Sequence, residues 1–144
     1  MITEQDLIGT WLLQSWEARD TGIDEIRYPY GEGAKGILIY TTDGWMSATL
    51  CSKQREPFPA YDKPADVPTA LKAEAFDQYF HYSSTYEIKD DEVFHDVKFS
   101  SNPSFPGTMQ VRKMNLEGNI LTLSVENAGG KQHLQWKRSS VADS

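Results

Sequence analysis

The chain has 144 residues, of which 39% are hydrophobic and 24% charged, with a formal net charge of -7 and a pI of about 4.9. This length suits one domain with a single core, so we expect one domain over residues 1–144, ordered over 6–138, with a frayed tail at 139–144. The acidic charge disfavours nucleic acid and anionic membrane surfaces as partners.

The N-terminal sequence MITEQDL lacks the basic and apolar stretches of a secretion signal, and no segment approaches the roughly 18 apolar residues of a membrane span. We therefore predict a cytoplasmic protein. Cys51 is alone, and the three histidines, His81, His95 and His133, are too scattered for a metal-ligand motif. No nucleotide fingerprint, phosphate-binding glycine loop or nucleophile elbow is present, so we expect neither a cofactor nor a metal.

Short runs of alternating hydrophobicity, separated by turn residues, predict an all-β antiparallel fold. The expected strands are 9–19, 23–30, 36–41, 45–50, 83–89, 92–99, 108–116, 120–126 and 132–138. In the first of these, alternation from Trp11 places Glu17 on the inward face. A buried carboxylate needs a partner.

The next expected hairpin turns at Asp43-Gly44, a pair that suits a two-residue type I′ turn because both residues tolerate positive φ. This register gives the hairpin two faces. The expected core face consists of Ile37, Ile39, Met46, Ala48 and Leu50. The mixed face consists of Leu38, Tyr40, Ser47 and Thr49.

A helix is expected at about 67–81, after the proline-broken stretch REPFPAYDKP, with Asp66 as its N-cap and Pro68 in its first turn. Its apolar face would consist of Leu71, Ala75, Phe76, Tyr79 and Phe80. Such a face predicts packing against the sheet, and the alternative is a lid over the mouth of a barrel.

In the hairpin that turns around KDDE, Tyr86 opposes His95 whether the loop has two residues or four. Alternation places His95 on the apolar side with Val93 and Val97. A histidine at such a position is either bonded within the core, with Tyr86 as its neighbour, or a general acid/base.

The hairpin MQVRKMNLEGNILTLSV places Arg112 on an apolar face, together with Gln110 and Met114. Glu17 is the expected partner of Arg112, directly, through water or through a ligand. Arg112 could instead be a structural clasp stacked on Trp11, and Gln110 either a network member or a pocket donor. So many polar groups on inward faces favour a pocket over a filled core.

The tripeptide Gly9-Thr10-Trp11 resembles the Gly-x-Trp signature of lipocalins, in which the first strand's Trp closes the narrow end of a barrel. Further matching segments are SWE (15–17), RYPYGE (27–32), GILIYTTDGWMSA (36–48), STYEI (84–88), GTMQVRKMNLEGNILTL (107–123) and Trp136. Over residues 7–138 the chain resembles the lipocalin-like domain family of small bacterial and fungal proteins. The resemblance implies an up-and-down antiparallel β-barrel of about 8–10 strands with an internal cavity, the helix being inserted between strands.

Together these inferences predict that the barrel cavity binds a small, largely apolar molecule with a polar or anionic end. The expected ligand-binding residues are Glu17, Met46, Tyr86, His95, Gln110, Arg112 and Met114. One alternative is a cofactor-free enzyme of cyclase, isomerase or dehydratase type, acting on a polyketide-like or other carbonyl substrate. Its catalytic residues would be His95 as general acid/base, with Tyr86 or Arg112 stabilising an enolate or oxyanion. A second alternative is a protein with a filled core that acts through its surface, for example as a homodimer.

Overall fold

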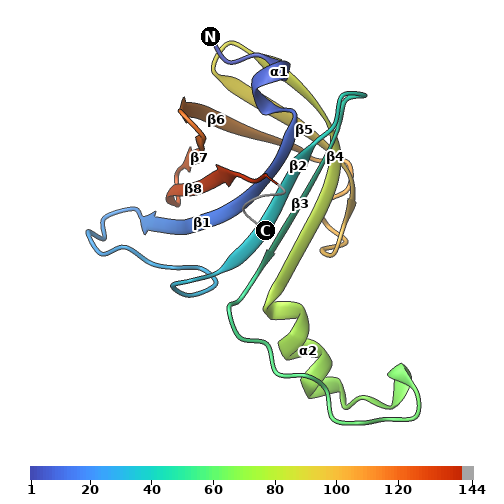
Figure 1. Cartoon of the computed structure of the whole chain (residues 1–144). Helices are drawn as coiled ribbons and strands as arrows, with labels where there is room; N and C mark the ends of the chain where they lie inside the picture. The colour runs from blue at the N-terminus through green and yellow to red at the C-terminus, as the bar shows by residue number, and fades with distance from the viewer. Residues whose placement is uncertain (141–144) are drawn as a thin grey trace.

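A computed structural model describes residues 1–140, in which eight strands form a closed antiparallel barrel (Figure 1). The strands are β1 Gly9–Asp20, β2 Lys35–Tyr40, β3 Trp45–Cys51, β4 Tyr79–Lys89, β5 Glu92–Ser100, β6 Met109–Glu117, β7 Ile120–Asn127 and β8 Gly130–Arg138. Each strand pairs with its successor, and β8 returns to β1, so the barrel is of the up-and-down type. Of the expected tail, residues 141–144 lie outside the described part of the chain.

One end of the barrel is closed by the short helix α1 (Glu4–Leu7) and by Trp11, whose side chain is fully buried. The indole Nε1 of Trp11 donates a hydrogen bond of 2.9 Å to the carbonyl of the last helical residue. The Arg138 guanidinium lies 4.1 Å from the centre of the Trp11 ring and donates to the carbonyl of Ile8 at 2.9 Å. The arginine clasp on Trp11 is therefore Arg138, and the alternative that assigned this role to Arg112 is wrong.

A β-bulge in β1 reverses the inward face of the first strand. The register against β8 shifts between Leu13 and Ser15. Beyond this shift the inward residues are Trp16 and the buried Ala18, so Glu17, which lies between them, faces outward. The expectation that Glu17 points inward toward Arg112 is wrong, because a single extra residue moves every later side chain to the other face.

The first hairpin also differs from its expected register. Its loop has three residues, 42–44, because the Thr41 N–H bonds the Trp45 carbonyl at 2.8 Å, and Gly44 has a φ of 91°. The faces of β2 are therefore exchanged: Leu38 and Tyr40 are buried and share the inward face with Met46 and Ala48, whereas Ile37 and Ile39 share the outer face with Ser47 and Thr49.

The two later hairpins have the predicted registers. Tyr86 pairs with His95 across β4 and β5, around a two-residue loop. Met114 pairs with Leu123 across β6 and β7, which places Arg112 on the inward side of β6. These two hairpins position the polar residues of the interior.

The expected strand at 23–30 does not form, and the barrel has eight strands, within the expected range of about 8–10. Residues 21–34 form a loop in which Arg27 makes an isolated bridge to Ala18, with both backbone hydrogen bonds at 2.7 Å. Pro29 has no N–H for a strand ladder, and Gly31 and Gly33 have φ of 86° and 80°, which turns the chain.

Residues 52–78 project from the other end of the barrel as an arm, which contains the 3-10 turn η1 (Pro64–Asp66) and the helix α2 (Thr69–Asp77) (Figure 1). The helix is shorter than expected because Tyr79 and Phe80 pair with β3 as part of β4. Asp66 does not cap it, since the N-cap is Pro68, without a side-chain bond.

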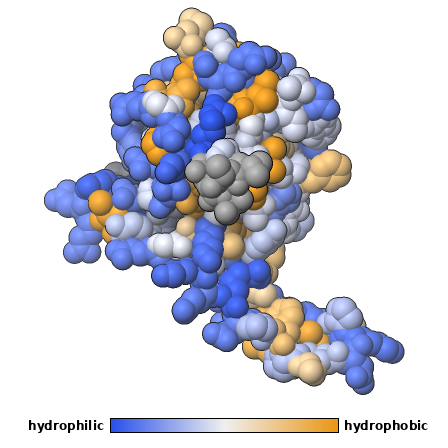
Figure 2. Space-filling model, in the orientation of Figure 1, coloured by the Kyte–Doolittle hydropathy of each residue, from blue (hydrophilic) through white to orange (hydrophobic). Residues whose placement is uncertain are grey.

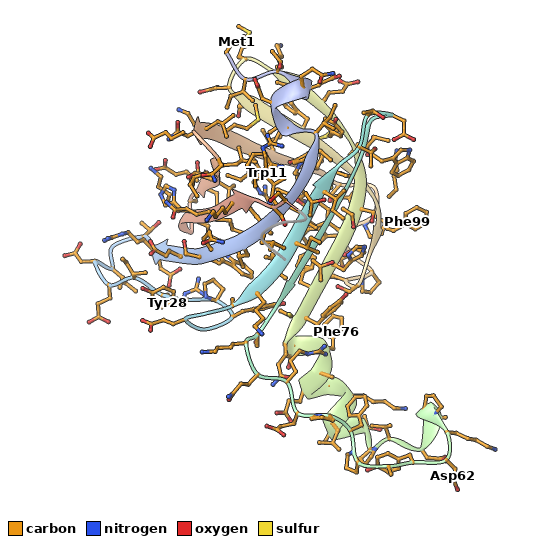
Figure 3. The ribbon with its side chains drawn as sticks, in the orientation of Figure 1. Met1, Trp11, Tyr28, Asp62, Phe76 and Phe99 are labelled. Carbon is orange, nitrogen blue, oxygen red and sulfur yellow. The ribbon has the colours of Figure 1, made fainter. Side chains whose placement is uncertain are left out.

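The arm stands away from the barrel, and hydrophobic and hydrophilic residues mix on its surface (Figure 2). No residue of α2, which lies wholly within the described chain, is buried, and Phe76 is 51% exposed (Figure 3). The expected packing of this helix on the sheet is therefore wrong. No helix among residues 1–140 is long and apolar enough to cross a membrane.

Candidate functional site

The barrel encloses a cavity of about 90 Å³. It extends toward the end from which the arm projects, where Leu50 and Phe80 belong to its lining. The lining residues are Trp16, Leu38, Ala48, Leu50, Phe80, Tyr82, His95, Phe105, Arg112, Leu123, Val125, Gln132, Leu134 and Trp136. Most of this lining is apolar, and a small number of polar groups interrupt it, as is usual for small-molecule sites.

His95 is held between two tyrosine hydroxyls. Its Nε2 lies 2.8 Å from the Tyr40 hydroxyl and its Nδ1 lies 2.8 Å from the Tyr82 hydroxyl. Burial, and secondarily the positive charge of Arg112, lower the pKa of His95 to about 3. Burial also raises the pKa of Tyr40 and of Tyr82. All three side chains are therefore neutral near pH 7.

Tyr86 is the cross-strand neighbour of His95 but not its hydrogen-bond partner. Its hydroxyl donates to the carbonyl of Thr41 at 2.8 Å, and its ring meets Tyr40 edge-on at 4.8 Å between centroids. Tyr86 does not belong to the cavity lining described above. Its contacts secure the loop of the first hairpin.

Arg112 lines the cavity and has no carboxylate partner within the described chain. Its Nη1 donates to the Val111 carbonyl at 3.0 Å and its Nη2 to Gln110 Oε1 at 3.4 Å. None of the three ion pairs found within residues 1–140 includes it. Gln110, which is held in turn by a 2.9 Å bond to Thr108, positions the guanidinium.

Two tryptophans, Trp16 and Trp136, line the cavity. Trp16 Nε1 donates to Gln132 Oε1 at 2.9 Å. Trp136 is only 2% exposed, and within residues 1–140 its Nε1 has no hydrogen-bond acceptor. A buried donor without an acceptor is costly, so this N–H is available to a ligand.

Of the seven expected ligand-binding residues, the structure places His95 and Arg112 in the cavity wall. Met46 and Met114 are buried in the core but do not line the cavity. Gln110 acts behind Arg112. Glu17 faces outward from β1, and Tyr86 bonds the Thr41 carbonyl outside the cavity lining.

Sequence reasoning missed Tyr40, Tyr82, Trp16 and Gln132 as site residues. Tyr82 falls between the expected helix and the next expected strand but belongs to β4, and a two-residue turn at Asp43-Gly44 would give Tyr40 the opposite face from the one it has. Trp16 reaches the interior only because of the bulge in β1. The sequence carried one usable signal, the alternation of Phe80, Tyr82 and Ser84, which continues the β4 pattern backward.

A larger hollow of about 430 Å³ lies on the arm, between the loop at 55–59 and α2. It is lined by partly and fully exposed residues, and Arg55 lies over the Tyr79 ring at 5.1 Å beside it. It contains none of the predicted site residues, so the barrel interior is the candidate site.

An eight-stranded up-and-down barrel with an internal cavity is the architecture of lipocalins, and here the Trp of the first strand lies buried at the closed end. The chain belongs to the lipocalin-like domain family, whose model matches residues 8–141. The predicted resemblance is thus confirmed, and a barrel of this family suggests ligand binding in a cavity.

Among solved structures, the chain is similar to the crystal structure of an uncharacterized protein from Bacteroides eggerthii. The two chains are 16% identical with a TM-score of 0.48, and the match covers 92% of this chain and 99% of the other. A comparison with curated proteins gave no match.

Proposed function

We propose that the protein binds a small, largely apolar molecule with a polar or anionic end inside the barrel, and that Arg112 holds that end. The observation that carries the proposal is the position of Arg112, a cation in the cavity wall without a carboxylate partner in the described chain. A cation in partly apolar surroundings is costly unless an anion or acceptor compensates it.

The separation of roles between two arginines supports this proposal. Arg138 already provides the clasp on Trp11, so Arg112 is not needed to close the barrel. A guanidinium has five N–H donors, and the bonds to Val111 and Gln110 leave several of them for a ligand. A charge-assisted hydrogen bond of this kind contributes about 1.5 to 3 kcal/mol.

The size of the cavity limits the ligand. At about 90 Å³ it is smaller than the roughly 150 Å³ apolar cavity that accepts benzene. A ligand of a few carbon atoms fits without rearrangement. A longer one would need to displace Phe80 or Phe105, whose rings meet edge-on at 4.8 Å in the cavity wall.

The geometry supports binding more than the enzymatic alternative. Both ring nitrogens of His95 are engaged by tyrosine hydroxyls, which leaves neither free to exchange a proton with a substrate in this arrangement. A pKa of about 3 also makes His95 a weak general base near neutral pH. The hydroxyl of Tyr86 is bonded to a backbone carbonyl.

Native mass spectrometry of the protein as purified from cells tests the proposal, with Ala48→Leu as the comparison. Ala48 is 5% exposed and lines the cavity, so the larger side chain fills space that a ligand would occupy. We expect the parent to carry a small molecule that is released on denaturation, and the folded variant to carry much less. Equal occupancy of parent and variant would place the ligand outside the barrel and overturn the proposal.

A further inference from the structure

The Tyr40, His95 and Tyr82 side chains have one more polar proton than their mutual hydrogen bonds use. A neutral imidazole has one N–H, and each phenol has one O–H, which makes three protons. Two hydrogen bonds join the three groups, each 2.8 Å long. One tyrosine therefore accepts from His95 and has its own O–H proton free for another acceptor.

The surroundings of the two tyrosines decide which hydroxyl carries the free proton. Tyr40 is 1% exposed and lies outside the cavity lining, and His95 is the one hydrogen-bond partner of its hydroxyl within residues 1–140. A free proton there would be a buried, unsatisfied donor. Tyr82 lines the cavity, where a ligand can accept from it. Tyr40 therefore donates to Nε2, and the Nδ1–H of His95 donates to the Tyr82 oxygen.

We propose that the Tyr82 O–H, the Arg112 guanidinium and the Trp136 indole N–H provide the free hydrogen-bond donors of the cavity, and that these donors select a carboxylate as the polar end of the ligand. This inference rests on the proposed function and specifies the chemistry of its ligand. The amide oxygens of Gln132 and Gln110 each accept one hydrogen bond already, from Trp16 and Arg112 respectively.

A carboxylate fits these donors because it accepts hydrogen bonds at two oxygens and has no proton to donate. An alcohol, an amide or an ammonium group brings N–H or O–H protons of its own, which the Arg112 and Trp136 N–H groups cannot accept. Arg112 adds a preference for negative charge, and burial, together with the charge of Arg112, lowers the pKa of His95 and keeps its imidazole neutral. The arrangement of these side chains therefore predicts both the tautomer of His95 and a carboxylate as the end group of the ligand.

The tautomer can be measured on the unmodified protein by NMR of the imidazole nitrogens of His95. We expect a neutral ring with its proton on Nδ1. A proton on Nε2 would give Tyr82 the donor role toward His95, remove its O–H from the cavity and overturn the inference, whatever the ligand proves to be.

The ligand preference can be measured by NMR titration with butanoate, butanamide and butan-1-ol, which share a chain length that suits the cavity. We expect butanoate to bind at least tenfold more tightly than either neutral probe. Tyr82→Phe should weaken butanoate binding about tenfold. Tyr86→Phe is the matched control and should leave it unchanged, because the Tyr86 hydroxyl donates to the Thr41 carbonyl.

The outcomes separate the two proposals. If butan-1-ol or butanamide binds as tightly as butanoate, the selection of a carboxylate is overturned while binding in the cavity stands. If no probe binds and the purified protein carries no small molecule, the proposed function fails, and this inference fails with it. If Tyr82→Phe does not fold, the tautomer measurement and the comparison of probes on the parent protein still test the inference.

Discussion

His95 shows how burial converts an ionisable residue into a neutral element of the interior. Two hydroxyls satisfy its ring, and the surrounding barrel removes the water that would stabilise an imidazolium. The neutral ring bonds the hydroxyls of Tyr40 and Tyr82 and holds both in fixed positions.

This burial makes the stability of the protein depend on pH. The pKa of His95 is about 3 in the folded state and about 6.5 when unfolded, so protonation favours the unfolded chain. The part of the free energy of unfolding that depends on neutral His95 is complete above about pH 6.5. It is lost as the pH falls toward 3, at about 1.4 kcal/mol per pH unit. Urea unfolding of the parent and of His95→Gln should show their stability difference shrinking by about 2 kcal/mol between pH 7 and pH 5. Parallel pH profiles would mean that His95 is already accessible to protons in the folded state.

The two inward arginines should respond differently to the same substitution. Arg138→Lys loses the planar contact with Trp11 and the bond to Ile8, so we expect a lower melting temperature and an unchanged ligand affinity. Arg112→Lys keeps the charge but loses the fork that a carboxylate would engage, so we expect about tenfold weaker binding and little change in melting temperature. Calorimetric titration and thermal unfolding of both variants measure this contrast. The reverse pattern would exchange the two assigned roles.

At the scale of elements, turn length determines which hairpin registers can be predicted from the sequence. The registers of the β4–β5 and β6–β7 hairpins were predictable because the loop alternatives considered preserved the same side-chain parity. The β2–β3 register was not, because a three-residue loop and a two-residue loop fit the same Asp43-Gly44 sequence with opposite parity.

The bulge in β1 and the end of α2 were unpredictable for different physical reasons. The sequence around Gln14 contains no glycine or proline to mark a bulge, and the register shift is imposed by pairing with β8, more than a hundred residues away. Tyr79 and Phe80 suit either a helix or a strand by composition, and pairing with β3 decides for the strand. Arg112 could be placed correctly because its hairpin is local.

The arm should be dispensable for the barrel. Its ends meet where the Ser52 N–H donates to the Gln78 carbonyl at 3.0 Å, and α2 contributes no buried residue. We expect that replacing residues 53–77 with a short Asn-Gly turn changes the melting temperature by only a few degrees. Thermal unfolding and the NMR spectrum of the barrel check this. A loss of folding would show that the arm stabilises the β3–β4 edge in a way that its exposure does not indicate.

At the scale of the whole molecule, the barrel combines a packed, closed end with a hollow opposite half. Trp11, α1 and Arg138 close one end, whereas Phe80 and Phe105 belong to the cavity wall toward the arm. This division lets one half of the molecule supply stability while the other half keeps space for a ligand.

Removal of the closing side chain should therefore be costly. Trp11→Ala is expected to lower the free energy of unfolding by about 3 to 5 kcal/mol, because a fully buried indole and its contact with Arg138 are both lost. Trp45, which is 39% exposed, serves as the control, and Trp45→Ala should cost much less. Denaturant unfolding compares the two, and equal losses would contradict the role of Trp11 in closing the barrel.

Binding of a small anionic molecule inside the barrel can be tested most directly by NMR of the four tryptophan indole N–H groups during titration with butanoate. Trp136 and Trp16 line the cavity, whereas Trp11 donates to the carbonyl of Leu7 at the closed end and Trp45 lies on the surface, so the chain contains its own controls. We predict a saturable shift of the Trp136 signal, a smaller one for Trp16, and none for Trp11 or Trp45. Saturable binding that leaves the Trp136 signal unmoved would place the ligand outside the cavity and contradict the proposed function.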